Sequence, residues 1–243
     1  MPDEQEQAQP ERILVVTAHP DDVDFGAAGS VAVWVSSGIE VHYCVVTDGD
    51  AGGFDPAVPR TEIGGIRRAE QRAAAAAVGV SDVTFLGYPD GALFVTHELR
   101  RDISRVIRQV RPQRVVTQSP ERNFERIYAS HPDHLAAGEA ALCAVYPDAR
   151  NPFAHVALAD EGLDPWTVTE VWLMGALSRG PSTYVDITAA LDKKVAALRA
   201  HASQTEHMED LAGFIRGWAE GTASSAGWES GRLAEAFMVV NTG

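Results

Sequence analysis

Two short motifs in this sequence combine histidine and aspartate at spacings that suit metal binding. His19 and Asp22 stand three residues apart in the segment AHPDD, and His131 and His134 stand three apart in HPDH. Imidazole nitrogens and carboxylate oxygens are ligands of zinc, and a catalytic zinc takes three protein ligands and leaves a position for water. A site built from these motifs needs three of the four residues. The fourth, together with Asp21, is then free for acid–base or electrostatic catalysis.

Histidines also occur in proteins without any role in metal binding. A lone histidine is more often a surface or core residue than a ligand, and we interpret His42, His97, His155 and His207 in that way. Two spaced pairs, both at the ends of expected strands, are much harder to explain without a metal. The sequence has no G-x-G-x-x-G, P-loop, G-x-S-x-G or H-E-x-x-H motif, so it lacks the signatures of nucleotide binding and serine hydrolysis.

The motifs are embedded in alternating strand-like and helix-like segments joined by short connections, a pattern that predicts an α/β fold with a parallel sheet. Strands are expected at 12–18, 40–49, 82–88, 114–118, 169–177, 183–188 and 235–240, and helices at 27–38, 61–80, 96–112, 131–147, 189–204 and 207–221. Ligands of such sheets bind beyond the carboxyl ends of the strands, where both motifs fall. We expect one domain over 1–243, a disordered tail at 1–11 and an irregular excursion at 147–166.

Composition narrows the classes of partner. The chain has 243 residues and a formal net charge of −14, which argues against nucleic acids and anionic membranes as partners. No apolar stretch approaches the ~20 residues of a membrane span. The acidic N-terminus lacks the features of a signal or transit peptide, so we expect a cytoplasmic protein, with Cys44 and Cys143 as free thiols. The sequence leaves a homo-oligomer open.

At the two histidine motifs the sequence resembles the LmbE-like, PIG-L-type zinc-dependent N-deacetylases. That family carries A-H-P-D-D after its first strand and H-P-D-H further on, and weaker matches place the resemblance over about residues 12–204. These weaker matches are TDGDAGG (47–53), Arg67-x-x-Glu70, FLGYPDG (85–91) and HASQ (201–204). The sequence departs from the family at Val23, where a glutamate is usual, and at Ala129, where some members have a tyrosine that here stands one position away, as Tyr128.

The resemblance implies a three-layer, Rossmann-like fold, with a mostly parallel central sheet and helices on both faces. It also implies roles for individual residues. His19, Asp22 and His134 would hold Zn²⁺, although Fe²⁺ or Co²⁺ would suit the same ligands. Asp21 would be the general base, and His131 would stabilise the oxyanion and help to protonate the leaving amine.

Five further residues have expected roles around the metal site. The resemblance implies that Arg67 and Asp90 contact substrate. Asp133 either orients His131 or is a carboxylate that favours the start of a helix. His201 and Gln204 either close the site or cap a helix end.

The leading interpretation is a zinc-dependent hydrolase that removes an N-acyl group, typically acetyl, from an amino sugar or its conjugate. Its partner would be a small molecule. One alternative is an amidase that acts on a thiol conjugate of the mycothiol type. A second alternative is a metal-containing binding protein without turnover, against which the presence of Asp21 beside three ligands argues.

Overall fold

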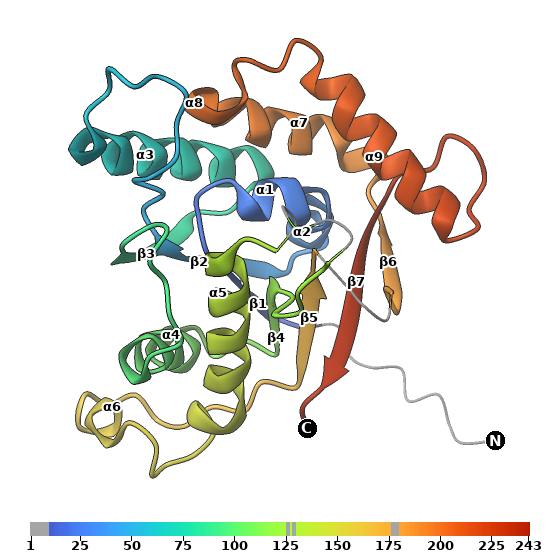
Figure 1. The fold of residues 1–243 in the computed structure, drawn as a ribbon. Helices are drawn as coiled ribbons and strands as arrows, with labels where there is room; N and C mark the ends of the chain where they lie inside the picture. The colour runs from blue at the N-terminus through green and yellow to red at the C-terminus, as the bar shows by residue number, and fades with distance from the viewer. Residues whose placement is uncertain (1–9, 125–126, 128–129, 176–179) are drawn as a thin grey trace, which may run out of the picture.

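In the computed structural model, which describes residues 10–124, 127, 130–175 and 180–243, seven strands form one sheet in the order β3-β2-β1-β4-β5-β7-β6 (Figure 1). The first five strands in this order are parallel, whereas β7 runs antiparallel to both of its neighbours. The strands are β1 Arg12–Thr17, β2 Glu40–Thr47, β3 Asp82–Tyr88, β4 Arg114–Gln118, β5 Glu170–Met174, β6 Thr183–Asp186 and β7 Ala234–Asn241. The mostly parallel α/β fold expected from the sequence is confirmed.

The helices lie close to their predicted places, with two breaks that the pattern did not indicate. The segment predicted at 27–38 starts earlier and is divided at Ala27, and the one predicted at 189–204 is divided at His201. The helices are α1 Asp22–Gly26, α2 Ala28–Ser36, α3 Arg60–Val78, α4 His97–Val110, α5 Pro132–Cys143, α6 Val156–Asp160, α7 Leu191–Ala200, α8 Ala202–Thr205 and α9 Leu211–Ser225. None of the helices in the described ranges is long and apolar enough to cross a membrane.

Strand β1 lies inside the sheet and is buried on both faces, which explains its continuous apolar run. Ile13 and Val15 join the core formed with α2, α3, α7 and α9. Leu14 and Val16, which point the other way, join the core formed with α4 and α5. Helices therefore cover both faces of the sheet, and three layers result (Figure 1).

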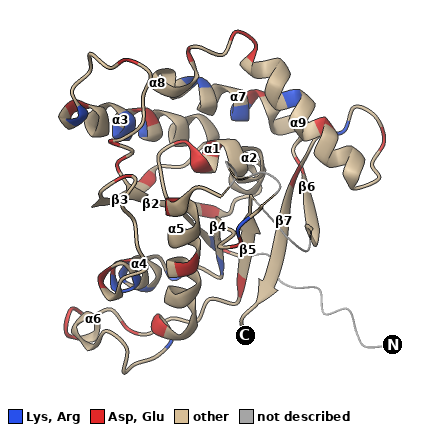
Figure 2. Cartoon of the chain, viewed as in Figure 1, with Lys and Arg blue, Asp and Glu red and all other residues tan. Residues whose placement is uncertain are grey.

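The excursion predicted at 147–166 is mostly irregular but contains α6, and α4 anchors it. The guanidinium of Arg108 donates to backbone oxygens of residues between 148 and 163, at 3.0–3.3 Å. Arg100 donates two hydrogen bonds, of 2.9 and 2.7 Å, to the carboxylate of Asp148. Figure 2 shows acidic and basic residues side by side along α4, and part of this charged face holds the excursion in place.

Helix α5 approaches strand β4 very closely. A Cβ atom at Gly138 would lie 2.2 Å from the backbone oxygen of Gln118, a distance that no side chain tolerates. Only glycine permits this contact. The contact brings the start of α5, with the second histidine motif, to the carboxyl ends of β1 and β4.

Candidate metal centre and active site

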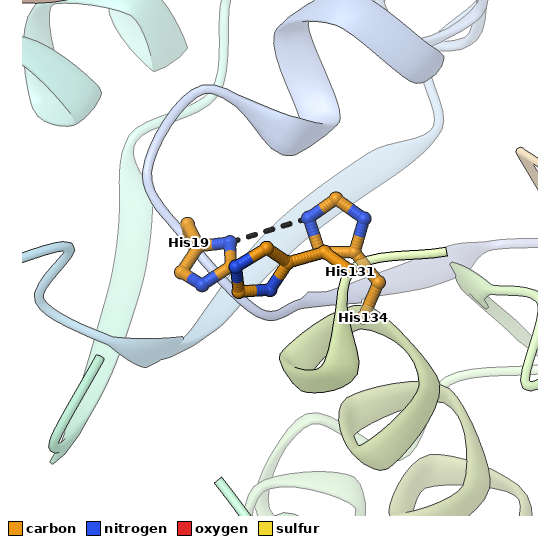
Figure 3. Close-up of side chains that lie close together, drawn as sticks. All are labelled: His19, His131 and His134. Atoms are coloured by element: carbon orange, nitrogen blue, oxygen red, sulfur yellow. Dashed lines mark hydrogen bonds between the residues drawn. The ribbon is translucent and has the colours of Figure 1, made fainter. Parts of the chain in front are cut away.

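The two histidine motifs meet at the carboxyl end of β1. His19 comes from the loop that follows β1, whereas His131 and His134 come from the start of α5 (Figure 3). His19 Nδ1 lies 3.2 Å from His134 Nε2. The Asp22 carboxylate lies 3.4 Å from His19 Nδ1 through Oδ2 and 3.0 Å from His134 Nε2 through Oδ1. The structure thus brings the three predicted ligands to one point.

Local hydrogen bonds give both motifs their shape. The backbone N–H of His19 donates to Asp22 Oδ2 at 2.7 Å, which folds the AHPDD segment into a tight turn. Gln118 Oε1 accepts from the N–H of Ala18 at 2.9 Å and so fixes the start of this turn. In the second motif, His131 Nδ1 accepts from the N–H of Asp133 at 3.2 Å and caps α5.

The other nitrogen of His19 contacts two carboxylates. Its Nε2 lies 3.0 Å from Asp90 Oδ1 and 3.2 Å from Asp133 Oδ2. Asp133 is itself held by the backbone N–H groups of Gly91 and Leu93, at 2.7 and 3.2 Å. In the neutral ring that metal binding requires, these partners place the N–H of His19 on Nε2 and leave the lone pair of Nδ1 facing His134 and Asp22. The side chain of Asp133 therefore orients His19, and only its backbone N–H contacts the ring of His131.

The charged groups around His19 indicate whether the site suits a metal ion. Burial disfavours its protonated form, but hydrogen bonds to Asp133, Asp22 and Asp90 outweigh burial and raise the pKa of His19 to about 12. The cluster therefore strongly favours positive charge at this point. Two imidazoles and one carboxylate form a common donor set of catalytic zinc sites. The residues present fit a divalent metal ion.

His131 offers a second grouping of possible ligands. Ligand atoms of His19, His131 and His134 lie within 4.8 Å of one another, as do those of His19, Asp90 and Asp133. However, His131 Nδ1 is occupied by a backbone N–H, so the neutral ring carries its proton on Nε2. Asp90 and Asp133 likewise accept backbone N–H groups. Asp22 also accepts a backbone N–H, but its carboxylate faces His19 Nδ1 and His134 Nε2, whereas Asp90 and Asp133 contact the opposite nitrogen of His19. This geometry makes Asp22 the better third ligand.

The carboxylate of Asp21 pairs with the guanidinium of Arg67. Arg67 Nη2 donates to Asp21 Oδ2 at 3.0 Å and to the Pro20 oxygen at 2.6 Å, and Nη1 donates to the Gly49 oxygen at 3.1 Å. Burial raises the pKa of Asp21 to about 6, although Arg67 opposes this change. Arg67 is only 4 % exposed and is used in these internal contacts. Its contact with substrate, like that of Asp90, stays a prediction.

Three further residues lie behind the site, and sequence reasoning gave no role to two of them. Gln71 accepts from the N–H of Asp21 through Oε1 at 2.8 Å and donates to Asp24 Oδ2 through Nε2 at 2.8 Å. His201 Nε2 lies 2.8 Å from the same Asp24 oxygen. One available signal was the spacing of Gln71, four residues after Arg67, which puts both on one face of α3.

The HASQ segment lies against α3. Glu70 accepts from the N–H and the hydroxyl of Ser203, at 2.8 and 2.7 Å, and Gln204 donates to the Ser203 hydroxyl at 3.0 Å. His201 precedes α8, but its side chain contacts Asp24 and does not cap that helix. Tyr128 and Ala129, the positions compared with the family tyrosine, lie outside the described residues.

Comparison with known proteins points to one family. The family model PIG-L, described as GlcNAc-PI de-N-acetylase, matches residues 14–145. The chain is 33% identical over 193 residues to the diacetylchitobiose deacetylase of Thermococcus kodakarensis, covering 79% of this chain and 70% of that protein. It is 32% identical over 203 residues to a probable N-acetyl-alpha-D-glucosaminyl L-malate deacetylase 2 of Bacillus cereus, covering 81% and 84%. The solved N,N'-diacetylchitobiose deacetylase of Pyrococcus horikoshii superposes with a TM-score of 0.86 at 29% identity, covering 96% of this chain and 85% of that one.

Proposed function

The chain belongs to the PIG-L family, and from this membership and the geometry of the site we propose that it is a metal-dependent hydrolase that removes an N-acetyl group from an amino sugar or its conjugate. The observation that carries the proposal is the convergence of His19, Asp22 and His134 with Asp21 beside them. Relatives named as deacetylases of diacetylchitobiose and of N-acetylglucosaminyl malate support an N-acetylglucosamine unit in the substrate.

We assign the metal to His19 Nδ1, His134 Nε2 and the Asp22 carboxylate, with zinc as the ion that best suits this donor set. When bound, a divalent cation polarises a carbonyl group and makes water more acidic. Asp90 and Asp133 keep the N–H of His19 on Nε2 and so keep Nδ1 available as a ligand.

Asp21 is assigned the role of general base. A pKa of about 6 lies close to neutral pH, where a base combines ionisation with affinity for a proton. Arg67 fixes the direction of the carboxylate through Oδ2 and leaves the other oxygen to accept a proton from the attacking water. Asp21 then passes this proton to the nitrogen of the leaving amine, so that hydrolysis of one amide consumes one water.

His131 is assigned to the amide oxygen, on which negative charge develops. Its Nδ1 accepts a backbone N–H, so its Nε2–H is the donor that it can offer. Burial, followed by the neighbouring His19 and His134, lowers the pKa of His131 and favours this neutral form. A positioned donor of this kind stabilises an oxyanion. The expectation that His131 also protonates the leaving amine stays a prediction.

Cys44 and Cys143 are not paired in a disulfide, which supports action in a reducing compartment, and we propose the cytoplasm. The substrate would be a small molecule that reaches the carboxyl ends of β1 and β4.

The test combines metal analysis with an assay for released amine. Diacetylchitobiose, N-acetylglucosaminyl malate, N-acetylglucosamine and an N-acylated thiol conjugate form the panel. We expect one bound divalent ion and amine release from at least one acetylated sugar. The ion should be lost in His134→Ala and kept in His42→Ala, a matched histidine that pairs with Glu40 on β2. Metal binding without any amine release would indicate a binding protein, and release from the thiol conjugate alone would indicate the alternative amidase.

A further inference from the structure

We propose that Gln71, Asp24 and His201 are positioning residues that hold Asp21 in the orientation it needs as a base. This inference rests on the proposed function for its catalytic consequence. Its structural content, however, can be tested without activity. The three residues come from α3, α1 and the end of α7, and all three are completely buried.

The backbone of Asp21 needs such support. Its φ angle is 90°, in the left-handed region that residues with a side chain rarely adopt. Conformations of this kind persist only where the surrounding structure imposes them, and they cluster at functional sites. The Asp21 carbonyl accepts from the N–H groups of Asp24 and Phe25, at 2.9 and 3.0 Å, and its carboxylate accepts from Arg67. Its N–H group donates to the side-chain oxygen of Gln71.

Asp24 determines which way the amide of Gln71 points. A carboxylate can only accept hydrogen bonds, so it must face the amide nitrogen of Gln71, which lies at 2.8 Å. The amide oxygen is then directed to the N–H of Asp21, also at 2.8 Å. With the opposite amide orientation, the nitrogen would face another donor, and Asp21 would lose this contact.

His201 completes the support by holding Asp24. Its Nε2–H donates to Asp24 Oδ2 at 2.8 Å, the same oxygen that accepts from Gln71. Asp24 and His201 are both completely buried, so water does not compete for this hydrogen bond. Asp24 is therefore held in the position from which it directs the amide of Gln71.

The first test is Gln71→Met, which keeps the volume of the side chain and removes both hydrogen bonds. We expect kcat to fall by about 10- to 100-fold, the scale of a misplaced catalytic group, with KM and metal content unchanged. The matched control is Gln113→Met, because Gln113 Oε1 accepts from the N–H of Arg12 at 2.9 Å, at the opposite end of β1. The control should lower Tm and leave kcat unchanged. Wild-type kcat in Gln71→Met would overturn the proposal.

Two variants of His201 test whether its hydrogen bond to Asp24 matters or only the volume of its side chain. His201→Phe fills the site without a donor, whereas His201→Gln carries an N–H that can reach Asp24. We expect His201→Gln to retain clearly more of kcat than His201→Phe. Equal kcat in the two variants would contradict a positioning role for His201.

A crystal structure of Gln71→Met provides the readout that does not depend on activity. We expect the φ angle of Asp21 to leave the left-handed region once its N–H loses Gln71. An unchanged Asp21 backbone would overturn the proposal. If the wild-type protein releases no amine from any substrate of the panel, the proposed function fails, and this structure still decides whether Gln71 holds Asp21.

Discussion

Replacing Asp21 by asparagine isolates its proposed role as a base from its role in the fold. Asparagine is one of the few residues that adopt the left-handed backbone conformation readily, so the φ angle of 90° is tolerated. Its side-chain oxygen can still accept from Arg67 Nη2, and its backbone N–H can still donate to Gln71. The substitution therefore removes the capacity to take a proton and little else.

The size of the expected effects follows from these contacts. A positioned general base contributes about 10²- to 10⁴-fold to the rate, so kcat should fall by that factor, or about 3–5 kcal/mol in the barrier. Arg67 loses a charged partner but keeps the backbone oxygens of Pro20 and Gly49. The free energy of unfolding should change by about 1–2 kcal/mol, which is about 2–8 °C in Tm for a chain of this size. The variant should thus be folded and inactive.

The assay measures released amine at saturating metal, alongside the metal content of the purified protein. Asp148→Asn is the matched control, because Asp148 is also a buried carboxylate that pairs with an arginine, Arg100, but on the excursion held by α4. It should lower Tm without lowering kcat. Asp21→Asn with full metal content and more than about a tenth of wild-type kcat would refute Asp21 as the base. Loss of the metal would instead make Asp21 a ligand.

Three other outcomes are expected. Adding zinc at about 100 times its Kd to metal-free protein should stabilise it by about 2.7 kcal/mol, or about 5–11 °C in Tm by scanning fluorimetry, and His134→Ala should abolish this shift. Asp133→Asn should weaken metal affinity by about 10- to 100-fold in a chelator competition, because Asp133 orients His19. Burial raises the pKa of Asp148, but its contacts with Arg100 and His155 outweigh burial and lower the pKa below the ordinary value. The ionised form of Asp148 therefore stabilises the fold at neutral pH, and this stability is lost as the pH falls below about 4. Urea titrations of wild type and Asp148→Asn should show a difference in unfolding free energy at neutral pH that becomes smaller below about pH 4.

The sequence was sufficient to predict the residues that meet at the strand ends, because metal ligation restricts both residue type and local spacing. His19 and Asp22 share one turn, and His131 and His134 share the start of one helix, so each pair is recognisable without knowledge of the fold. A continuous apolar run such as that of β1 also indicates a strand buried on both faces. From these features it follows that the pairs converge beyond a parallel sheet.

The contact of Asp90 could not be predicted in the same way. The GYPDG segment was expected at a strand end, and the structure puts it there, but the side chain of Asp90 reaches His19 Nε2 at 3.0 Å. Which atom it reaches depends on the register of β3 against β2, and that register shifts between Val45 and Thr47. An irregularity of this kind in pairing leaves no pattern in hydrophobic periodicity. Periodicity therefore predicts that the loop lies at the strand end, but it does not indicate which atom Asp90 contacts.

The hydrogen bonds of Asp24, Gln71 and His201 behind Asp21 could not be predicted from the sequence. Asp24, Gln71 and His201 stand on three different elements, and no spacing rule relates them. Each is an ordinary residue when taken alone: a carboxylate at a helix start, a polar residue on a helix, and a residue near a helix end. Their hydrogen bonds exist because α3 and α7 pack side by side over α1 and bring three polar side chains into a space closed to water. In such a space every donor must find an acceptor, so the packing of all three elements determines the direction of the Gln71 amide. Through this amide, the same packing determines the position of Asp21.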